Sequence, residues 1–134
     1  MDCCDPGAPS TRALCRSCGA AGRNVEWITV KSLLTARALE RADASEYRFC
    51  GSPGCDVVYF TERLAFRRED VRVPAFPKEP PGARVVCYCF EIVEGGIDAE
   101  TESRIRAHVS AGRCACEIKN PEGRCCLGNL RSLR

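Results

Sequence analysis

Twelve cysteines and a single histidine, His108, constrain this chain of 134 residues more than any other feature. Hydrophobic residues make up 45% of the chain only when these cysteines are counted, so the apolar core is small for a globular domain. Chains with small cores usually need disulfides or bound metal for stability. The start, Met1–Pro6, lacks the basic and apolar regions of a secretory signal, which predicts a cytoplasmic protein with reduced cysteines. Bound metal is therefore the expected source of stability.

The composition also limits the ligands and the functions. One histidine excludes zinc sites built from two or three histidines, so thiolates must supply most of the metal ligands. No apolar run approaches the ~18 residues of a membrane span. A net charge of +2 gives no support for binding to nucleic acid or to a membrane. Since no nucleophile–base pair or phosphate-binding loop stands out, we expect a metal-binding protein rather than an enzyme.

The proline-rich segment 74–84 divides the chain. Proline cannot pair within a sheet or continue a helix, so we predict a stiff connector there. Residues 1–12 are small and polar and are predicted to be a mobile tail. This leaves a first subdomain over residues 13–73 and a second over residues 85–134.

Short elements of both kinds are expected, which predicts an α+β fold. Apolar residues at helical spacing predict a helix over residues 30–40, capped by Thr29. Two runs rich in aromatic and β-branched residues, 47–50 and 56–60, predict a hairpin. The other expected elements are extended segments at 25–28, 64–66, 71–73 and 85–90, a helix over 99–111 with Asp98 as cap, Ile105 and Val109 inward and Gly112 as its end, and a last helix over 126–133.

The first group of cysteines has the spacing of a structural zinc site. Cys15 and Cys18 form a C-x2-C pair, and Cys50 and Cys55 form a C-x4-C pair on either side of the hairpin loop. A short loop lets two thiolates reach one ion, and two such pairs complete the tetrahedron that zinc prefers. We therefore predict a closed Zn²⁺ site that joins the hairpin to the N-terminal pair. Four buried, reduced thiols are the alternative.

The second subdomain offers six cysteines for four ligand positions, namely Cys87, Cys89, Cys114, Cys116, Cys125 and Cys126. A C-x-C pair on an extended segment places both side chains on one face, which suits the dinuclear core of a [2Fe–2S] cluster. The last helix would begin at the adjacent cysteine pair and offer its positive end to such a cluster. A second zinc ion satisfies the same ligand count, so spacing leaves both open.

Several strings resemble the N-terminal domain of CopZ-type copper chaperones, from about Cys15 to the end of the chain. The matching strings are Tyr47–Cys50, Cys55–Phe60, Phe66–Arg68, Val86–Cys89 and Asn120–Cys126. The string Asn-Pro-x-Gly-Arg-Cys-Cys is the most specific of them. The C-terminal part is also similar to [2Fe–2S] domains of the bacterioferritin-associated-ferredoxin type, through Cys87–Phe90 and Ala111–Cys114.

This resemblance implies one zinc ion and one [2Fe–2S] cluster. The zinc ligands of the family correspond to Cys15, Cys18, Cys50 and Cys55, and the cluster ligands to Cys87, Cys89, Cys116 and Cys126. Cys114 and Cys125 are the alternatives to their neighbours. The implied fold is a zinc-knuckle hairpin and helix subdomain followed by a helical cluster-binding subdomain.

The implied function is a cytoplasmic redox metallochaperone that transfers one electron in the handling of copper or another soft metal. The only methionine is Met1, so the M-x-C-x-x-C motif of the family's copper-carrying domain is not in this sequence. We therefore expect a copper-carrying domain or transporter as a partner in trans. Cys3 and Cys4 form a vicinal thiol pair suited to a soft ion. A zinc-only module that binds protein or nucleic acid is the alternative function.

Overall fold

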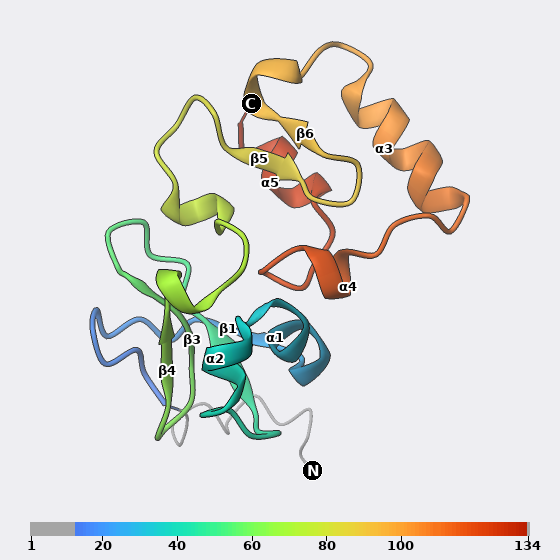
Figure 1. The fold of residues 1–134 in the computed structure, drawn as a ribbon. Coiled ribbons are helices and arrows are strands. Elements are labelled where there is room, and N and C mark those ends of the chain that lie inside the picture. Colours follow the sequence, from blue (N-terminus) through green and yellow to red (C-terminus); the bar gives the residue numbers. More distant parts are fainter. Residues whose placement is uncertain (1–12, 134) are drawn as a thin grey trace.

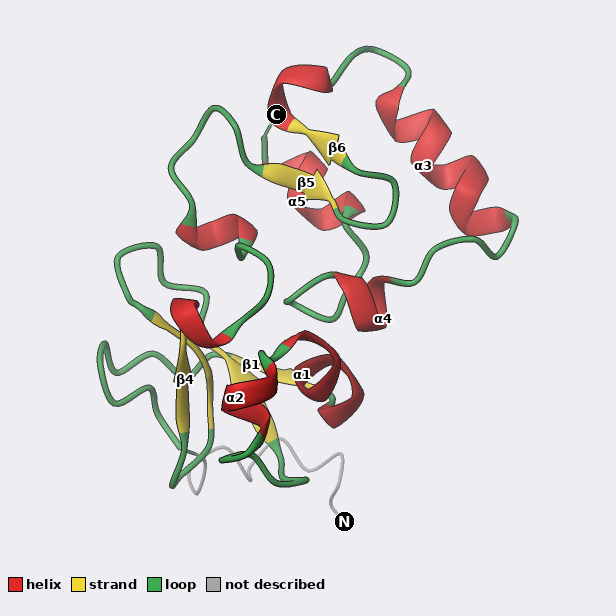
Figure 2. Ribbon diagram, viewed as in Figure 1, coloured by secondary structure: helices red, strands yellow, loops and turns green. Residues whose placement is uncertain are grey.

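The computed structural model describes residues 13–133, which form two lobes with a small sheet in each (Figure 1). The tail predicted at residues 1–12, with Cys3 and Cys4, lies outside the described residues. A four-stranded sheet in the order β1-β2-β3-β4 organises the N-terminal lobe, and a two-stranded sheet, β5-β6, organises the C-terminal lobe. Helices accompany both sheets (Figure 2), so the mixed class expected from the sequence is confirmed.

The sheet of the N-terminal lobe is antiparallel and contains the predicted hairpin. Its strands are β1 (Arg23–Val25), β2 (Tyr47–Phe49), β3 (Val57–Phe60) and β4 (Ala65–Arg67). All four side chains of β3 are buried. Val58 and Tyr59 lie in the main core of the lobe, whereas Val57 and Phe60 pack beside Cys15, Cys50 and Cys55. The central strand therefore connects the apolar core to the cysteines.

The helix predicted over residues 30–40 is two helices instead. The structure has α1 (Trp27–Leu33) and α2 (Ala36–Leu39), with a break at Leu34, which pairs with Val71 in an isolated bridge. Of the strand predicted at residues 71–73, only this bridge is present. Of the extended segment predicted at residues 25–28, only Val25 lies in a strand. The sequence pattern missed the break because a contact 37 positions along the chain causes it.

The predicted helix cap is also wrong. Glu26 precedes α1 at the N-cap position, while Thr29 lies inside the helix and is buried. The hydroxyl of Thr29 donates to the carbonyl of Glu117 in the C-terminal lobe. Thr35 caps the following helix instead, where its hydroxyl oxygen accepts the N–H of Ala38.

The proline-rich connector is packed against both lobes. Its residues Phe76–Lys78 form a single 3-10 turn, η3, in which the proline occupies an early position that needs no N–H. Phe76 is buried in the core of the C-terminal lobe, and Lys78 is buried toward the cysteines of the N-terminal lobe. Three residues thus join the interiors of the two lobes.

The C-terminal lobe departs from the prediction in its strands more than in its helices. Strand β5 (Val85–Cys87) ends at Cys87, residues 88–90 form a turn, and β6 (Ile92–Val93) returns antiparallel to β5. The prediction of an extended C-x-C segment is therefore wrong, because Cys89 lies in the turn.

The predicted helices of this lobe are present. They are α3 (Thr101–Ser110) and α5 (Leu127–Ser132), and a short helix, α4 (Cys116–Lys119), was not predicted. Gly112 follows α3 at a φ of 74°, as expected of a helix end. Glu100 occupies the N-cap position, and the carboxylate of Asp98 accepts its N–H. Ile105 is fully buried but Val109 is 37% exposed, so only the former faces inward. None of the helices in the described part of the chain is long and apolar enough to cross a membrane.

A buried hydrogen bond joins the two lobes at Tyr59. Its hydroxyl donates to the carbonyl of Pro121 over 2.6 Å, and burial raises the pKa of Tyr59, which keeps the phenol protonated. Tyr59→Phe leaves that carbonyl without its partner and should lower the free energy of unfolding by about 1–3 kcal/mol. Urea denaturation of the zinc-loaded chain measures this. The half-buried Tyr88, which donates to the carbonyl of Pro74, gives the control Tyr88→Phe with a smaller loss; equal losses would contradict the assignment.

Candidate metal centres

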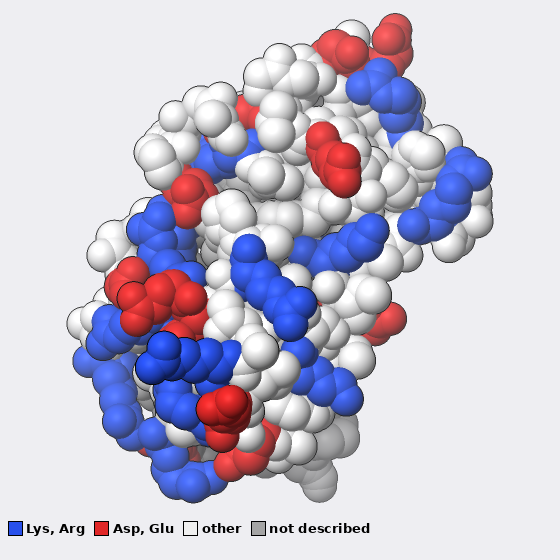
Figure 3. Space-filling view, viewed as in Figure 1, with Lys and Arg blue, Asp and Glu red and all other residues white. Residues whose placement is uncertain are grey.

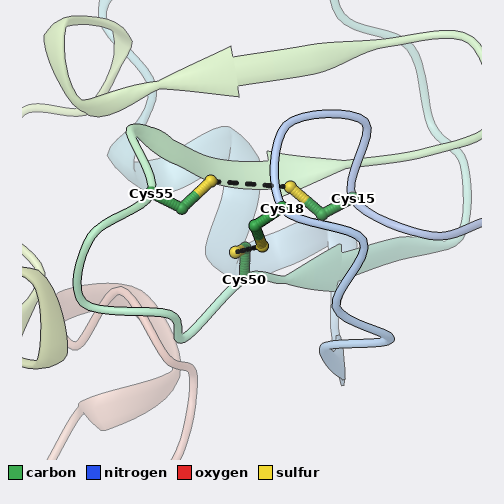
Figure 4. Close-up of side chains that lie close together, drawn as sticks. All are labelled: Cys15, Cys18, Cys50 and Cys55. Atoms are coloured by element: carbon green, nitrogen blue, oxygen red, sulfur yellow. Dashed lines mark hydrogen bonds between the residues drawn. The ribbon is translucent and has the colours of Figure 1, made fainter.

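Four cysteines of the N-terminal lobe come together as a compact group (Figure 4). The sulfur atoms of Cys15, Cys18, Cys50 and Cys55 all lie within 4.8 Å of one another. The Sγ–Sγ distance is 3.7 Å between Cys15 and Cys55 and 3.6 Å between Cys18 and Cys50. A tetrahedron with Zn–S bonds of ~2.3 Å has edges of about 3.8 Å. The donor set, its number and its spacing therefore fit Zn²⁺.

Two tight loops position these sulfur atoms. The first is closed by hydrogen bonds from Cys15 N–H to the Ala20 carbonyl and from Gly19 N–H to the Cys15 carbonyl. In the second, Cys50 follows β2 and Cys55 precedes β3, so the hairpin loop holds both. Three of the four cysteines are buried and Cys18 is exposed. Four protein ligands leave no open position for a reactant, as in a structural zinc site.

The surroundings favour the thiolate form at the exposed end of this group. A hydrogen bond with Ser52, 3.3 Å from sulfur to oxygen, lowers the pKa of Cys18 to about 6. Burial raises the pKa of Cys15 to about 11 in the metal-free group. Such a thiol loses its proton only when the metal binds. Zinc binding therefore releases protons and depends on pH.

The second set of predicted ligands is arranged differently. The sulfur of Cys126 lies 2.9 Å from that of Cys87, and the sulfur of Cys89 lies 3.5 Å from that of Cys116. Cys116 and Cys126 lie in the same buried core, where the thiol of Cys126 lowers the pKa of Cys116 to about 6 and that of Cys116 raises the pKa of Cys126. The four sulfur atoms thus meet as two pairs, Cys87–Cys126 and Cys89–Cys116.

These four sulfur atoms are not arranged as ligands of a single metal ion. Among residues 13–133, the N-terminal group is the one set of potential ligands that lies close enough together for a single ion. A dinuclear core is longer than a single ion and takes two thiolates at each iron. Four thiolates spread over a longer site therefore fit it. The N–H of Ala115 donates to the sulfur of Cys89 over 3.1 Å, which would offset negative charge on that thiolate.

Burial separates the six cysteines of this lobe. Cys87, Cys116 and Cys126 are buried and Cys89 is half-buried, whereas Cys114 and Cys125 are exposed. The four less exposed cysteines are those that the family resemblance implies as ligands. His108 is no ligand candidate here, because its ring stacks on Phe90 and its Nδ1 accepts a hydrogen bond from Arg113.

The loop that connects α4 to Cys126 rests on the N-terminal lobe. Asn120 is buried, and its side chain bonds to the backbone N–H of Glu122 and the carbonyl of Arg124. Glu122 forms an ion pair with Arg23. Gly123 has a φ of 70°, and a Cβ there would lie 3.0 Å from the hydroxyl oxygen of Thr29, so only glycine fits.

Comparison with known proteins agrees with this geometry. Residues 12–72 match the family described as the CopZ "Zinc binding domain". The "Copper chaperone CopZ" of Archaeoglobus fulgidus is 31% identical over 124 residues, which are 89% of this chain. This chain spans 60% of the length of that relative.

The CopZ likeness extends through the C-terminal lobe. The X-ray structure of the Archaeoglobus fulgidus CopZ N-terminal domain superimposes with a TM-score of 0.73 at 28% identity. The match covers 90% of this chain and 97% of that domain. These matches agree with the CopZ-type resemblance seen in the sequence motifs, and the match to a zinc-binding domain together with the four-cysteine group supports Zn²⁺ as a cofactor.

Loss of a buried zinc ligand should remove the metal and unfold the N-terminal lobe. Cys55→Ser leaves three thiolates, and because zinc binding contributes directly to folding, both zinc and the cooperative thermal transition should be lost. Metal analysis of the full chain should show one zinc fewer than in the unsubstituted protein. The exposed Cys114 gives the control, since Cys114→Ser should keep both. A Cys55→Ser variant that keeps its zinc would show that this cysteine is no ligand.

Proposed function

We propose that this protein is a redox metallochaperone module that holds one structural Zn²⁺ and one [2Fe–2S] cluster and takes part in copper handling. The two sulfur pairs Cys87–Cys126 and Cys89–Cys116, on cysteines that are buried or half-buried, are the observation that carries the iron–sulfur part of this proposal. When bound, such a cluster supplies a one-electron couple, which balances the reduction of Cu(II) to Cu(I). In this role the protein is a carrier of metal and electrons, not an enzyme with an organic substrate.

The protein residues around the proposed cluster divide it into a buried and an accessible side. Cys87, the last residue of β5, is fully buried, whereas Cys89, in the turn after that strand, is half-buried. Cys126 is buried at the N-cap position of α5, and its sulfur contacts that of Cys87. The Cys89 side is therefore where an electron donor or acceptor would approach most closely.

Copper enters the proposal as cargo. The relative whose name includes copper chaperone is longer than this chain. We propose a copper-carrying domain or a transporter as the partner that exchanges copper with this module. We place the protein in the cytoplasm, because reduced thiolates persist in a reducing compartment. The redox partner is a one-electron donor or acceptor that docks near Cys89.

The surface gives less support to the zinc-only module that binds nucleic acid. On the face drawn in Figure 3, acidic side chains interrupt the basic ones over both lobes. Many arginines are paired with carboxylates, as in Arg41–Asp70, Arg63–Asp43 and Arg68–Glu79. A nucleic-acid surface needs basic groups that are free to meet phosphates.

Anaerobic purification followed by visible absorption and metal analysis tests the iron–sulfur proposal. We expect a red-brown protein with about two irons and two sulfides per chain, in addition to one zinc. Cys116→Ser and Cys126→Ser should lose the iron and the colour, whereas the matched neighbours, Cys114→Ser and Cys125→Ser, should keep both. A colourless protein with two zinc ions from iron-supplied cells would refute the proposal and favour the zinc-only module.

A second experiment tests the copper part separately. The iron-loaded chain is reduced with dithionite, freed of excess reductant and mixed with Cu(II) and a chelator specific for Cu(I). We expect about one Cu(I) per reduced cluster, because each cluster supplies one electron. Recovery of the oxidised absorption without formation of Cu(I) would contradict a role in copper reduction, and the iron count would still stand.

A further inference from the structure

Lys78 is a buried cation beside the zinc ligands. Its side chain comes from the connector turn η3 and is only 4% exposed. The ammonium nitrogen lies 3.8 Å from the sulfur of Cys50. It also donates to the carbonyl of Ser52 over 2.9 Å and to the carbonyl of Cys55 over 2.8 Å. All three contacts are within the hairpin loop that presents two of the four thiolates.

The charges of this region explain why a lysine is tolerated here. A buried cation is unfavourable unless an anion accompanies it. Among the ion pairs of residues 13–133, no carboxylate is paired with Lys78. Four thiolates around Zn²⁺ leave a net charge of −2, and burial weakens the screening of this charge by water. The zinc–thiolate group is thus the anion that Lys78 faces.

We propose that Lys78 is a positioning residue of the zinc centre. Its ammonium provides the counter-charge for the zinc-bound thiolates, fixes the loop between Cys50 and Cys55 through the two carbonyls, and thereby ties the connector to the zinc site. Phe76, in the same turn, is buried with Cys87, Cys116 and Cys126 in the core of the C-terminal lobe. Zinc binding in one lobe therefore holds in place the segment that packs into the other.

This assignment follows from the contacts of the lysine and does not depend on the iron–sulfur proposal. Within the part of the chain that the structure describes, the ammonium group of Lys78 contacts the zinc loop alone, through one sulfur and two carbonyl oxygens. The backbone of the turn is closed by hydrogen bonds from the N–H groups of Lys78 and Glu79 to the carbonyls of Ala75 and Phe76. Outer residues that contact metal ligands typically change metal affinity by about 10–100-fold when they are replaced.

Zinc affinity of four variants of the full chain tests the role of the charge. Competition with a chromophoric zinc chelator gives the affinity of each. Lys78→Met removes both charge and donors, Lys78→Gln keeps a donor without the charge, and Lys78→Arg keeps the charge. We expect Lys78→Met and Lys78→Gln to weaken zinc binding by about 10-fold or more. Lys78→Arg should retain most of the affinity of the unsubstituted chain. The control is Lys31→Met on α1, an exposed lysine, which should leave the affinity unchanged.

Two results would overturn the proposal. Zinc binding by Lys78→Met within threefold of the unsubstituted chain would remove any role for this residue. If Lys78→Gln binds zinc as tightly as the unsubstituted chain, or if Lys78→Arg binds it no more tightly than Lys78→Met, the charge of this residue does not determine zinc affinity. Because Lys78→Gln and Lys78→Arg are measured as well, the question is decided even if Lys78→Met fails to fold.

Amide hydrogen exchange tests the link to the connector. In the unsubstituted chain, removal of zinc with a chelator should speed exchange of the N–H groups of Lys78 and Glu79, because the turn loses its attachment. In Lys78→Gln these two groups should exchange rapidly with or without zinc. Exchange of both groups that is unchanged by zinc removal in the unsubstituted chain would contradict the proposed attachment.

Discussion

The grouping of Cys15 and Cys18 with the two cysteines of the hairpin, which fits one Zn²⁺, is the interaction on which the N-terminal lobe depends. Beside the sheet, a second small core consists of Cys15, Cys50, Cys55, Val57 and Phe60. Three of these five side chains are thiols, so apolar contact alone stabilises this core weakly. Structural zinc supplies about 10–16 kcal/mol of binding free energy, comparable to the ~5–15 kcal/mol by which a whole domain is stable. The metal therefore replaces the apolar core that the composition lacks.

The features predicted correctly from the sequence are those that depend on neighbouring residues. The two cysteine pairs, the hairpin about Gly51–Gly54 and the helix end at Gly112 follow from short-range geometry. The break between α1 and α2 and the burial of Lys78 follow from contacts with distant segments. A lysine among prolines looks like a solvated residue in the sequence. Nothing local indicates that its ammonium group contacts the sulfur of Cys50, 28 positions away, and the carbonyl of Cys55, 23 positions away.

The ligands proposed for the cluster illustrate the same limit. Spacing could not choose four of six cysteines, and the expected C-x-C strand is a turn in which only Cys87 continues the sheet. The sulfur atoms that meet, Cys87 with Cys126 and Cys89 with Cys116, are 39 and 27 positions apart. Burial adds what spacing lacks, since Cys114 and Cys125 face solvent. The family resemblance selected the same four cysteines because it carries this three-dimensional information.

The docking of the loop between α4 and α5 gives the zinc lobe a role beyond its own stability. This loop ends at Cys126, and Cys116 is the first residue of the short helix α4 that precedes it. The loop holds the string Asn-Pro-x-Gly-Arg-Cys-Cys. Tyr59 accommodates Pro121 through its hydrogen bond, and Thr29 leaves room only for glycine at position 123. The specificity of the string therefore reflects packing against the zinc lobe rather than metal chemistry alone. Because Zn²⁺ itself has no redox chemistry, a zinc-bound lobe suits the role of a fixed support for Cys116 and Cys126, two of the four cysteines proposed as cluster ligands.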